Sequence, residues 1–238
     1  NLVPRGRLSV DIGANKGDAT RRAIDEFPRA TVYAFEPAPK MTEALRERFK
    51  GHPGVCTIAA AVGDRPGAID FHVAADDLYS SALPPSELRR HYHDGEIDRV
   101  STVRVPMVAV DQWADENAID RVDIVKIDVQ GLETAVLRGA AEDIRTRGVL
   151  AVTCEAPLIR EYEGSCTYAE IDAMLNALGF EIHQVHECWT RGPEKQVVCL
   201  DALWLRRDAL SWIRRQPERA FEIGWRDAFH TTLARLHN

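Results

Sequence analysis

Four carboxylates stand at or near the ends of four apolar runs in this chain. They are Asp11, Glu36, Asp128 and Glu155. If these runs are parallel strands, their carboxyl ends meet at one edge of a sheet, where ligands bind in open α/β folds. Carboxylates gathered there can accept hydrogen bonds from sugar hydroxyls and can take protons as general bases. A structural role is the alternative for each residue, and Asp128 in particular could cap the helix that follows it.

The first of these acids precedes a turn with two glycines, in the segment LSVDIGANKGD at residues 8–18. Gly13 and Gly17 have no Cβ, so the backbone can approach a ligand closely, and the N-terminus of the next helix favours negative charge. The turn lacks the third glycine of a dinucleotide-binding fingerprint. Glu36 ends the next apolar run, close to the position at which an acid accepts ribose hydroxyls. Together, the turn and Glu36 indicate a ligand with a free ribose.

The elements that must position these residues follow from hydrophobic periodicity and turn chemistry. Apolar runs predict strands, and helical spacing ended by Pro or Gly predicts the helices between them. Such alternation is typical of a parallel sheet covered by helices. The strands are predicted at residues 8–12, 30–35, 55–62, 122–127 and 149–154, with an antiparallel closing pair at 180–185 and 196–205, and the helices at 18–27, 39–50, 131–138 and 168–178.

Residues 67–110 interrupt this alternation. The segments 68–73 and 100–110 alternate between apolar and polar residues, which predicts strands added near an edge of the sheet, as Pro106 indicates. The polar stretch between them is predicted to be a loop with a short helix at 85–91. Long insertions in a compact domain often form a lid or a substrate loop.

The composition limits the class of protein. The 238 residues carry a formal net charge of −7, which gives no support for a long nucleic-acid-binding track. We find no run of about 18 apolar residues and no export leader, so we expect no membrane span and a cytoplasmic protein. Five cysteines, never spaced as C-x-x-C, fit reduced thiols better than a disulfide framework.

Four segments carry a more specific pattern. They are VDIGANKGD at 10–18, YAFEPAP at 33–39, AAVGD at 60–64 and VDIVKIDVQGLETAVLRGA at 122–140. This pattern resembles the FkbM family of class I S-adenosylmethionine-dependent methyltransferases. The resemblance implies an α/β, Rossmann-like, doubly wound sheet of seven mostly parallel strands with an antiparallel C-terminal hairpin. It also implies S-adenosylmethionine as the methyl donor and a small-molecule acceptor.

The resemblance further implies roles for individual residues. Asp11 would help to hold the ammonium group of the donor, and Glu36 would accept its ribose hydroxyls. Asp128 would face the sulfonium and the acceptor, and it is the expected catalytic base, with Glu155 or a histidine of the insertion in reserve. The whole set implied for cofactor binding is Asp11, Gly13, Asn15, Gly17, Glu36, Pro37, Ala61, Val62 and Asp128.

Candidates for the acceptor side lie in the insertion. Ser80 and Ser81 resemble a short serine patch of the family. His91 and His93 would share one face of an extended segment, and a solvated loop is the alternative for both. Gln130 departs from the family pattern, in which Glu is common at this position. This departure puts in doubt any contact of that acid with the acceptor or with a cation.

The expected reaction is O-methylation of a hydroxyl group on a small molecule such as a secondary metabolite or a sugar, without a metal site. One alternative is an NAD-dependent oxidoreductase, which shares the acid after the second strand. The other is a non-catalytic binding protein on the same sheet. We expect a single domain at residues 8–207 and a helical extension at 208–238, whose apolar stripe either packs on the sheet or forms a homodimer surface.

Overall fold

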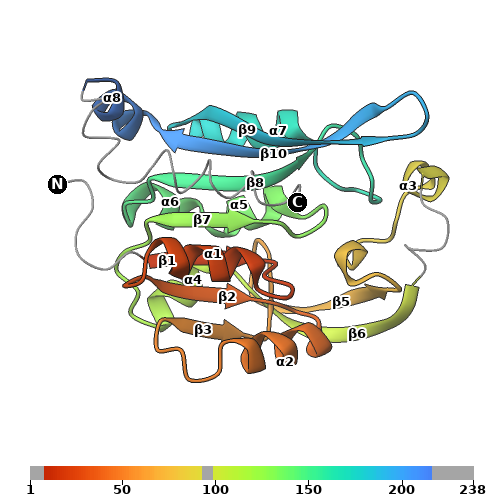
Figure 1. Ribbon diagram of the computed structural model, residues 1–238, viewed down its shortest axis with the longest axis horizontal. Coiled ribbons are helices and arrows are strands. Elements are labelled where there is room, and N and C mark those ends of the chain that lie inside the picture. Colours follow the sequence, from red (N-terminus) through yellow and green to blue (C-terminus); the bar gives the residue numbers. More distant parts are fainter. Residues whose placement is uncertain (1–7, 93–98, 216–238) are drawn as a thin grey trace.

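Seven strands form the main sheet in the part of the chain that the computed structural model describes, residues 8–92 and 99–215 (Figure 1). The parallel pairs are interrupted only by β10, which runs antiparallel to β8 and to β9. The predicted fold class is therefore confirmed. In spatial order the strands are β3 (Val55–Ile58), β2 (Thr31–Phe35), β1 (Leu8–Ile12), β7 (Ile124–Ile127), β8 (Ala151–Pro157), β10 (Gln196–Arg206) and β9 (Phe180–Arg191).

The strand order reverses between β1 and β7. The chain passes from β1 through β2 to β3, then returns to the other side of β1 and continues from β7 to β8. Because the crossover connections leave this point in opposite directions, a crevice opens at the carboxyl ends of the two strands. Asp11 on β1 pairs in register with Lys126 on β7, so these two charged residues are neighbours near the carboxyl ends of both strands.

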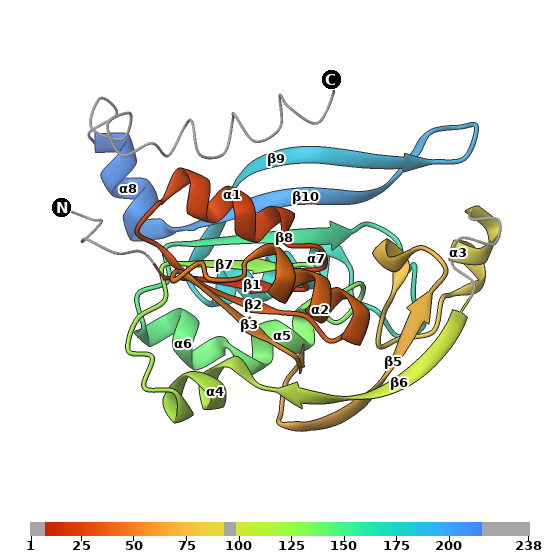
Figure 2. The same ribbon diagram turned by 60° about the horizontal axis from the view of Figure 1, so that its bottom comes forward.

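Helices cover both faces of the sheet (Figure 2). On one face lie α1 (Asp18–Glu26) and α2 (Pro39–Arg48). On the other face lie α4 (Val110–Glu116), α5 (Glu133–Gly139), α6 (Ala141–Thr146) and α7 (Tyr168–Ala177). A further helix, α8 (Arg207–Arg215), follows β10 directly. This two-sided cover determines the composition of the strands.

The central strands β1 and β7 each bury a row of apolar residues on one face of the sheet. Val10, Ile12, Val125 and Ile127 are each at most 2% exposed, as expected for a parallel sheet with helices on both sides. Trp204 on β10 is fully buried, and its indole N–H donates to the Asp172 carboxylate of α7 at 2.8 Å. A buried indole requires such a partner, so this bond fixes α7 against the antiparallel end of the sheet.

The insertion forms a second sheet instead of extra strands at the edge of the main one. In it β5 (Gly67–Ala74) pairs antiparallel with β6 (Arg99–Val108), and β4 (Ala61–Val62) pairs with the end of β6. The prediction of one strand at 55–62 is therefore wrong, because its second half leaves the main sheet. Pro106 lies on the middle strand of this sheet and not on an edge strand, and it is accommodated there because β4 pairs only with the two residues that follow it.

The helices α4 and α6 have no counterpart in the prediction. The alternating pattern at 100–110 runs directly into α4, whose buried residues Val110, Trp113 and Ala114 follow helical spacing. The alternation extends to the first residue of the helix and so obscures its start. The short helix predicted in the insertion is present as α3 (Glu87–Tyr92).

The strands β9 and β10 form a longer hairpin than predicted. It extends past β8 at the end of the sheet where α3 and the β5–β6 pair also project (Figures 1 and 2). Of the helical extension predicted at 208–238, the structure describes only the part within α8, and residues 216–238 lie outside the described residues. No helix within residues 8–92 and 99–215 is long and apolar enough to cross a membrane.

Candidate functional site

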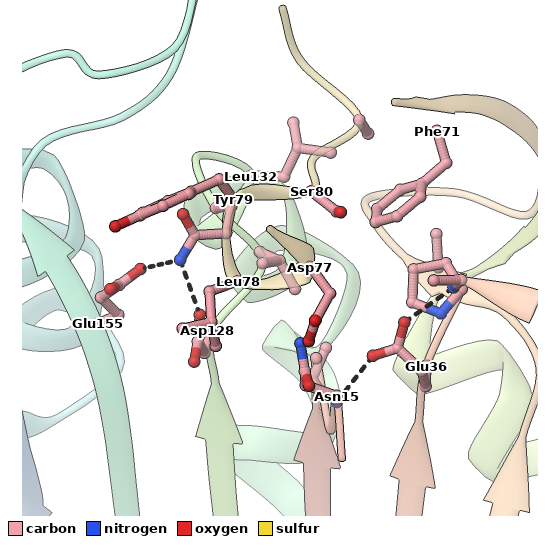
Figure 3. A pocket seen from close by; sticks show the side chains of 18 of the residues that line it. Asn15, Glu36, Phe71, Asp77, Leu78, Tyr79, Ser80, Asp128, Leu132 and Glu155 are labelled. Carbon is pink, nitrogen blue, oxygen red and sulfur yellow. Dashed lines mark hydrogen bonds between the residues drawn. The ribbon is translucent and has the colours of Figure 1, made fainter. Parts of the chain in front are cut away.

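A cavity of about 280 Å³ lies where the strand order reverses. The carboxyl ends of β1, β2, β7 and β8 border it, and the insertion and the β9–β10 hairpin contribute its outer walls (Figure 3). The structure brings most of the predicted site residues together here. Those that line the cavity are Gly13, Asn15, Glu36, Pro37, Ala61, Val62, Ser80, Asp128 and Glu155.

The loop after β1 is held mainly by the protein itself. The N–H groups of Gly13 and Ala14 donate to the Phe35 carbonyl at 3.0 and 2.9 Å. Gly13 has a φ of +78°, and a Cβ on it would lie 1.7 Å from the Asp128 carbonyl oxygen. The missing Cβ of Gly17 makes room for the Leu45 and Phe49 side chains, and Gly17 is absent from the lining of the cavity. Both glycines are therefore explained by packing of this chain.

Glu36 is a buried carboxylate at the edge of the cavity, 5% exposed. Its Oε2 accepts from the Asn15 N–H and its Oε1 from the Ala38 N–H, both at 2.8 Å (Figure 3). Burial raises the pKa of Glu36 to about 7, although these two N–H groups and Lys126 oppose the shift. Each carboxylate oxygen has a second lone pair, so the group can still accept hydrogen bonds from two ligand hydroxyls.

The part of the cavity beyond Glu36 is apolar. Phe35, Met41, Ala61, Val62 and Phe71 line it. Phe71 belongs to the insertion and faces the same space as Glu36 (Figure 3). An apolar slot beside a carboxylate that can accept two hydroxyl hydrogen bonds is suited to a flat ring joined to a sugar. The observed lining therefore fits a nucleoside.

Asp11 is the predicted site residue that turns away from this cavity. Its Oδ2 accepts from the Thr20 hydroxyl at 2.6 Å, and its Oδ1 lies 3.4 Å from Lys126 Nζ. It lines a cavity of about 550 Å³ beside α1, which adjoins the first cavity at Gly13, Asn15 and Asp128. Lys126 is largely buried, and a buried ammonium group needs polar partners. It also donates to the Gly13 carbonyl at 2.7 Å and lies 3.4 Å from Asp128. Burial alone lowers the pKa of Lys126, but Asp128 and Asp11 raise it above its usual value.

Asp128 and Glu155 face each other across the part of the cavity farthest from Glu36 (Figure 3). The Gln130 amide Nε2 donates to Asp128 Oδ1 at 3.2 Å and to Glu155 Oε2 at 2.5 Å. Burial, and after it the charges of Asp128 and Asp201, raise the pKa of Glu155 well above its usual range. This environment therefore favours the protonated form of the Glu155 carboxyl group.

The alternative role of Asp128 as a helix cap is not realised. The residue before α5 is Leu132, which makes no side-chain cap bond. Instead Glu133 reaches back to the loop, where its Oε1 accepts from the Gly131 N–H at 2.9 Å. Glu133 is fully buried, and burial raises its pKa. The side chain of Asp128 is thus available to the cavity.

The residues predicted for the acceptor side differ in whether they reach the cavity. Ser80, next to the 3-10 turn η1 (Asp77–Tyr79), lines the cavity, whereas the Ser81 hydroxyl donates to the Gln130 carbonyl at 2.7 Å and supports the loop after β7. For His91 only the backbone is described, within α3, and His93 lies outside the described residues.

Sequence reasoning missed several residues on the outer walls. Arg89 on α3 is 2% exposed, with a nitrogen 3.1 Å from the Glu161 carboxylate and its guanidinium 4.2 Å from the centre of the Tyr162 ring. On the hairpin, the Trp189 indole donates to Asp201 at 3.2 Å. Arg89 stands in a polar stretch with other charged residues, a pattern typical of a solvent-facing segment, so nothing in the sequence marked it.

Comparisons of the sequence with known proteins indicate one family. The family model described as the methyltransferase FkbM domain matches residues 11–182. The chain is 29% identical over 163 residues to the 2-O-methyltransferase NoeI of Sinorhizobium fredii, which covers 65% of this chain and 65% of that relative. It is 27% identical over 223 residues to the 31-O-demethyl-FK506 methyltransferase FkbM of Streptomyces tacrolimicus, covering 79% of this chain and 82% of the relative.

Among solved structures, the chain is similar to fibrillarin of Aeropyrum pernix, a structure with natively bound S-adenosyl-L-methionine. The two share 15% sequence identity with a TM-score of 0.46, over 86% of this chain and 68% of the other.

Proposed function

The chain belongs to the family of methyltransferases with an FkbM domain, and on this premise we propose that it methylates a hydroxyl oxygen of a small, uncharged acceptor. The observation that carries the proposal is the placement of three carboxylates around one cavity at the strand reversal. Glu36 lies at one end of this cavity, and Asp128 and Glu155 lie at the other. The matched region includes all three.

S-adenosylmethionine is the methyl donor of this family, and the cavity fits it. Glu36 would accept the ribose hydroxyls, with the Asn15 and Ala38 backbone already fixing its carboxylate. Ala61 and Val62 would lie along the adenine, and Gly13 and Asn15 would border the methionine part. When bound, the donor supplies a methyl group on a positively charged sulfur that is already an activated leaving group. The task left to the protein is alignment, exclusion of water and removal of one proton.

Asp128 is the residue that we infer to take the proton of the acceptor hydroxyl. Its side chain is 38% exposed and lines the cavity, and Lys126 lies 3.4 Å from its carboxylate. Glu155 is less suited to this role, because burial among other acids raises its pKa well above its usual range and so favours its protonated form. As the acceptor oxygen gains the methyl group, its proton passes to Asp128.

The charges of the cavity favour an uncharged acceptor. Six acidic residues line it, namely Glu36, Asp77, Asp128, Glu155, Glu161 and Asp201, against the two arginines Arg89 and Arg191 within the described lining. Arg89 is occupied by Glu161. Such an excess of negative charge repels phosphate and carboxylate groups. With Tyr79, Leu132 and Trp189 on the walls, the acceptor side suits a hydroxylated ring such as a sugar or a secondary metabolite.

A thermal-shift experiment tests the donor. We expect S-adenosylmethionine and S-adenosylhomocysteine to raise the melting temperature and NAD to leave it unchanged, since binding to the folded state alone stabilises it. A rise with NAD alone would instead support the oxidoreductase alternative, and no response to any of the three would support a non-catalytic protein.

Transfer of a labelled methyl group tests the acceptor. Neutral sugars and hydroxylated aromatic compounds should become methylated, and their phosphate esters should not. Asp128→Asn should bind the donor but lose turnover by about 100-fold, the usual contribution of a general base. Full turnover in that variant would remove Asp128 from the mechanism, and preferential methylation of the phosphate esters would overturn the proposed acceptor class.

A further inference from the structure

Gln130 stands at the junction between the catalytic carboxylates and the insertion. Its backbone adopts a φ of +55°, a conformation that side-chain-bearing residues rarely occupy, and its carbonyl accepts from the Ser81 hydroxyl at 2.7 Å. Its amide nitrogen donates to Asp128 Oδ1 at 3.2 Å and to Glu155 Oε2 at 2.5 Å. One NH₂ group thus bridges two carboxyl groups from neighbouring strands.

The orientation of this amide is fixed from the other side. The Tyr162 hydroxyl lies 2.8 Å from Gln130 Oε1 and 3.1 Å from the Tyr79 carbonyl oxygen, and Arg89 Nη2 lies 3.5 Å from the same Oε1. Arg89 can only donate and the Tyr162 hydroxyl can donate its one hydrogen, so the amide oxygen faces them and the nitrogen faces the carboxyl groups. Tyr162 is 3% exposed, with the Arg89 guanidinium 4.2 Å from its ring centre.

We propose that Gln130 is a positioning residue for methyl transfer, whose amide holds Asp128 and Glu155 side by side in the geometry that receives the acceptor hydroxyl. This inference rests on the proposed function, in which the site deprotonates a hydroxyl. A neutral NH₂ group gives one hydrogen to each carboxyl group and so offsets their repulsion without adding charge. The anchor at Tyr162 and Arg89 links this geometry to the seating of α3 and the insertion.

The charged groups around Asp128 and Glu155 make the hydrogen bonds from Gln130 important for the ionisation of this carboxyl pair. Groups that face the carboxyl pair from neighbouring elements are Glu133 on α5, Asp201 on β10, Glu161 after β8, Lys126 on β7 and Arg89 on α3. Acids outnumber cations in this set, and Arg89 is paired with Glu161. Without the two N–H donors, the remaining way to relieve the repulsion is a shared proton, so the pair should titrate at higher pH.

The first experiment compares Gln130→Met, which keeps the length of the side chain and removes its donors, with the exposed control Gln112→Met on α4. We expect the acid limb of the pH–kcat profile to move upward by about one pH unit in Gln130→Met. The affinity for S-adenosylhomocysteine should change less than threefold. Gln130→Glu should move the limb further in the same direction, because it adds a negative charge. Gln112→Met should behave as the wild type.

A second readout needs no acceptor. Carbon-13 NMR of labelled carboxyl groups, assigned with Asp128→Asn and Glu155→Gln, should show the pair titrating at higher pH in Gln130→Met. Tyr162→Phe, which removes only the anchor of the amide, should give a smaller shift in the same direction, and it serves as the test if Gln130→Met fails to fold.

The two hypotheses fail in different ways. If the wild type methylates no hydroxyl compound, the proposed function fails, whatever the NMR titration shows. If the wild type is active and both variants keep the wild-type pH profile and titration, the positioning role of Gln130 is refuted. A lower melting temperature without a change in either titration would assign Gln130 a merely structural role and would also overturn the inference.

Discussion

Replacing Glu36 by Gln isolates the ionisation of a single buried carboxylate. Glu36 is 5% exposed, and burial raises its pKa from 4.5 to about 7. Between these two pH values the unfolded chain has lost this proton while the folded protein still holds it. The unfolded state then binds fewer protons, so the free energy of unfolding of the wild type falls as pH rises from 4.5 towards 7 and levels off above it.

The size of the effect follows from the same shift. At about 1.4 kcal/mol for each tenfold change, the wild type should lose roughly 2–3 kcal/mol of unfolding free energy relative to Glu36→Gln between pH 5 and pH 8. The Gln side chain can accept from only one of the Asn15 and Ala38 N–H groups. That loss adds a constant offset at every pH, because an amide does not titrate.

Urea unfolding at several pH values between 5 and 8 measures this difference. The exposed Glu43→Gln variant on α2 is the matched control, and its unfolding free energy should follow that of the wild type at every pH. If the unfolding free energies of the wild type and of Glu36→Gln change in parallel with pH, burial does not hold the proton on Glu36, and the reasoning about its pKa is wrong.

The same variant tests the ribose contact. We expect 5′-methylthioadenosine, which keeps the nucleoside and lacks the titrating amino-acid part of the donor, to bind the wild type more tightly as pH rises through about 7. The ionised carboxylate is the better acceptor for two hydroxyls. In Glu36→Gln the affinity should be independent of pH and about 10–100-fold weaker at pH 8. Equal affinities at pH 8 would place the ribose elsewhere.

Two further substitutions test the supports of the site. Gly13→Ala should destabilise the protein by at least about 3 kcal/mol in urea unfolding, because its Cβ would lie 1.7 Å from the Asp128 carbonyl oxygen at a φ of +78°; a variant as stable as the wild type would contradict this packing. Arg89→Met should cost about 3–5 kcal/mol by leaving Glu161 unpaired, and Arg89→Met with Glu161→Gln should recover part of that loss, whereas additive losses would show that the two do not interact.

Much of the fold could be predicted from local patterns. Apolar runs, Pro and Gly punctuation and the alternation of strands with helices gave the parallel sheet and its antiparallel C-terminal pair. The acids after these runs marked the edge at which Glu36, Asp128 and Glu155 line one cavity. These predictions succeeded because strand direction alone brings the carboxyl ends of parallel strands together.

Which face of β1 borders the cavity could be assigned only from the structure. The sequence of β1 is LSVDI, in which Ser9 and Asp11 alternate with Val10 and Ile12, so the two pairs lie on opposite faces of the strand. Both faces are buried, and the alternation does not say which of them borders the cavity. Asp11 therefore looked equivalent to the other acids, yet it turns towards Thr20 and lines the adjoining cavity beside α1. The pairing of β4 with β6 is likewise a contact between distant segments that no local pattern specifies.

The sequence by itself determined the parallel sheet, the edge at which the cavity lies and three acids that line it. Only the tertiary structure decided how the acceptor half is organised. Gln130, Tyr162 and Arg89 lie 32 or more positions apart from one another in the chain. Their roles depend on distances and burial created when the insertion packs against the loop after β8. No periodicity or turn signal encodes such contacts, since the same residue types on a solvated loop give the same sequence.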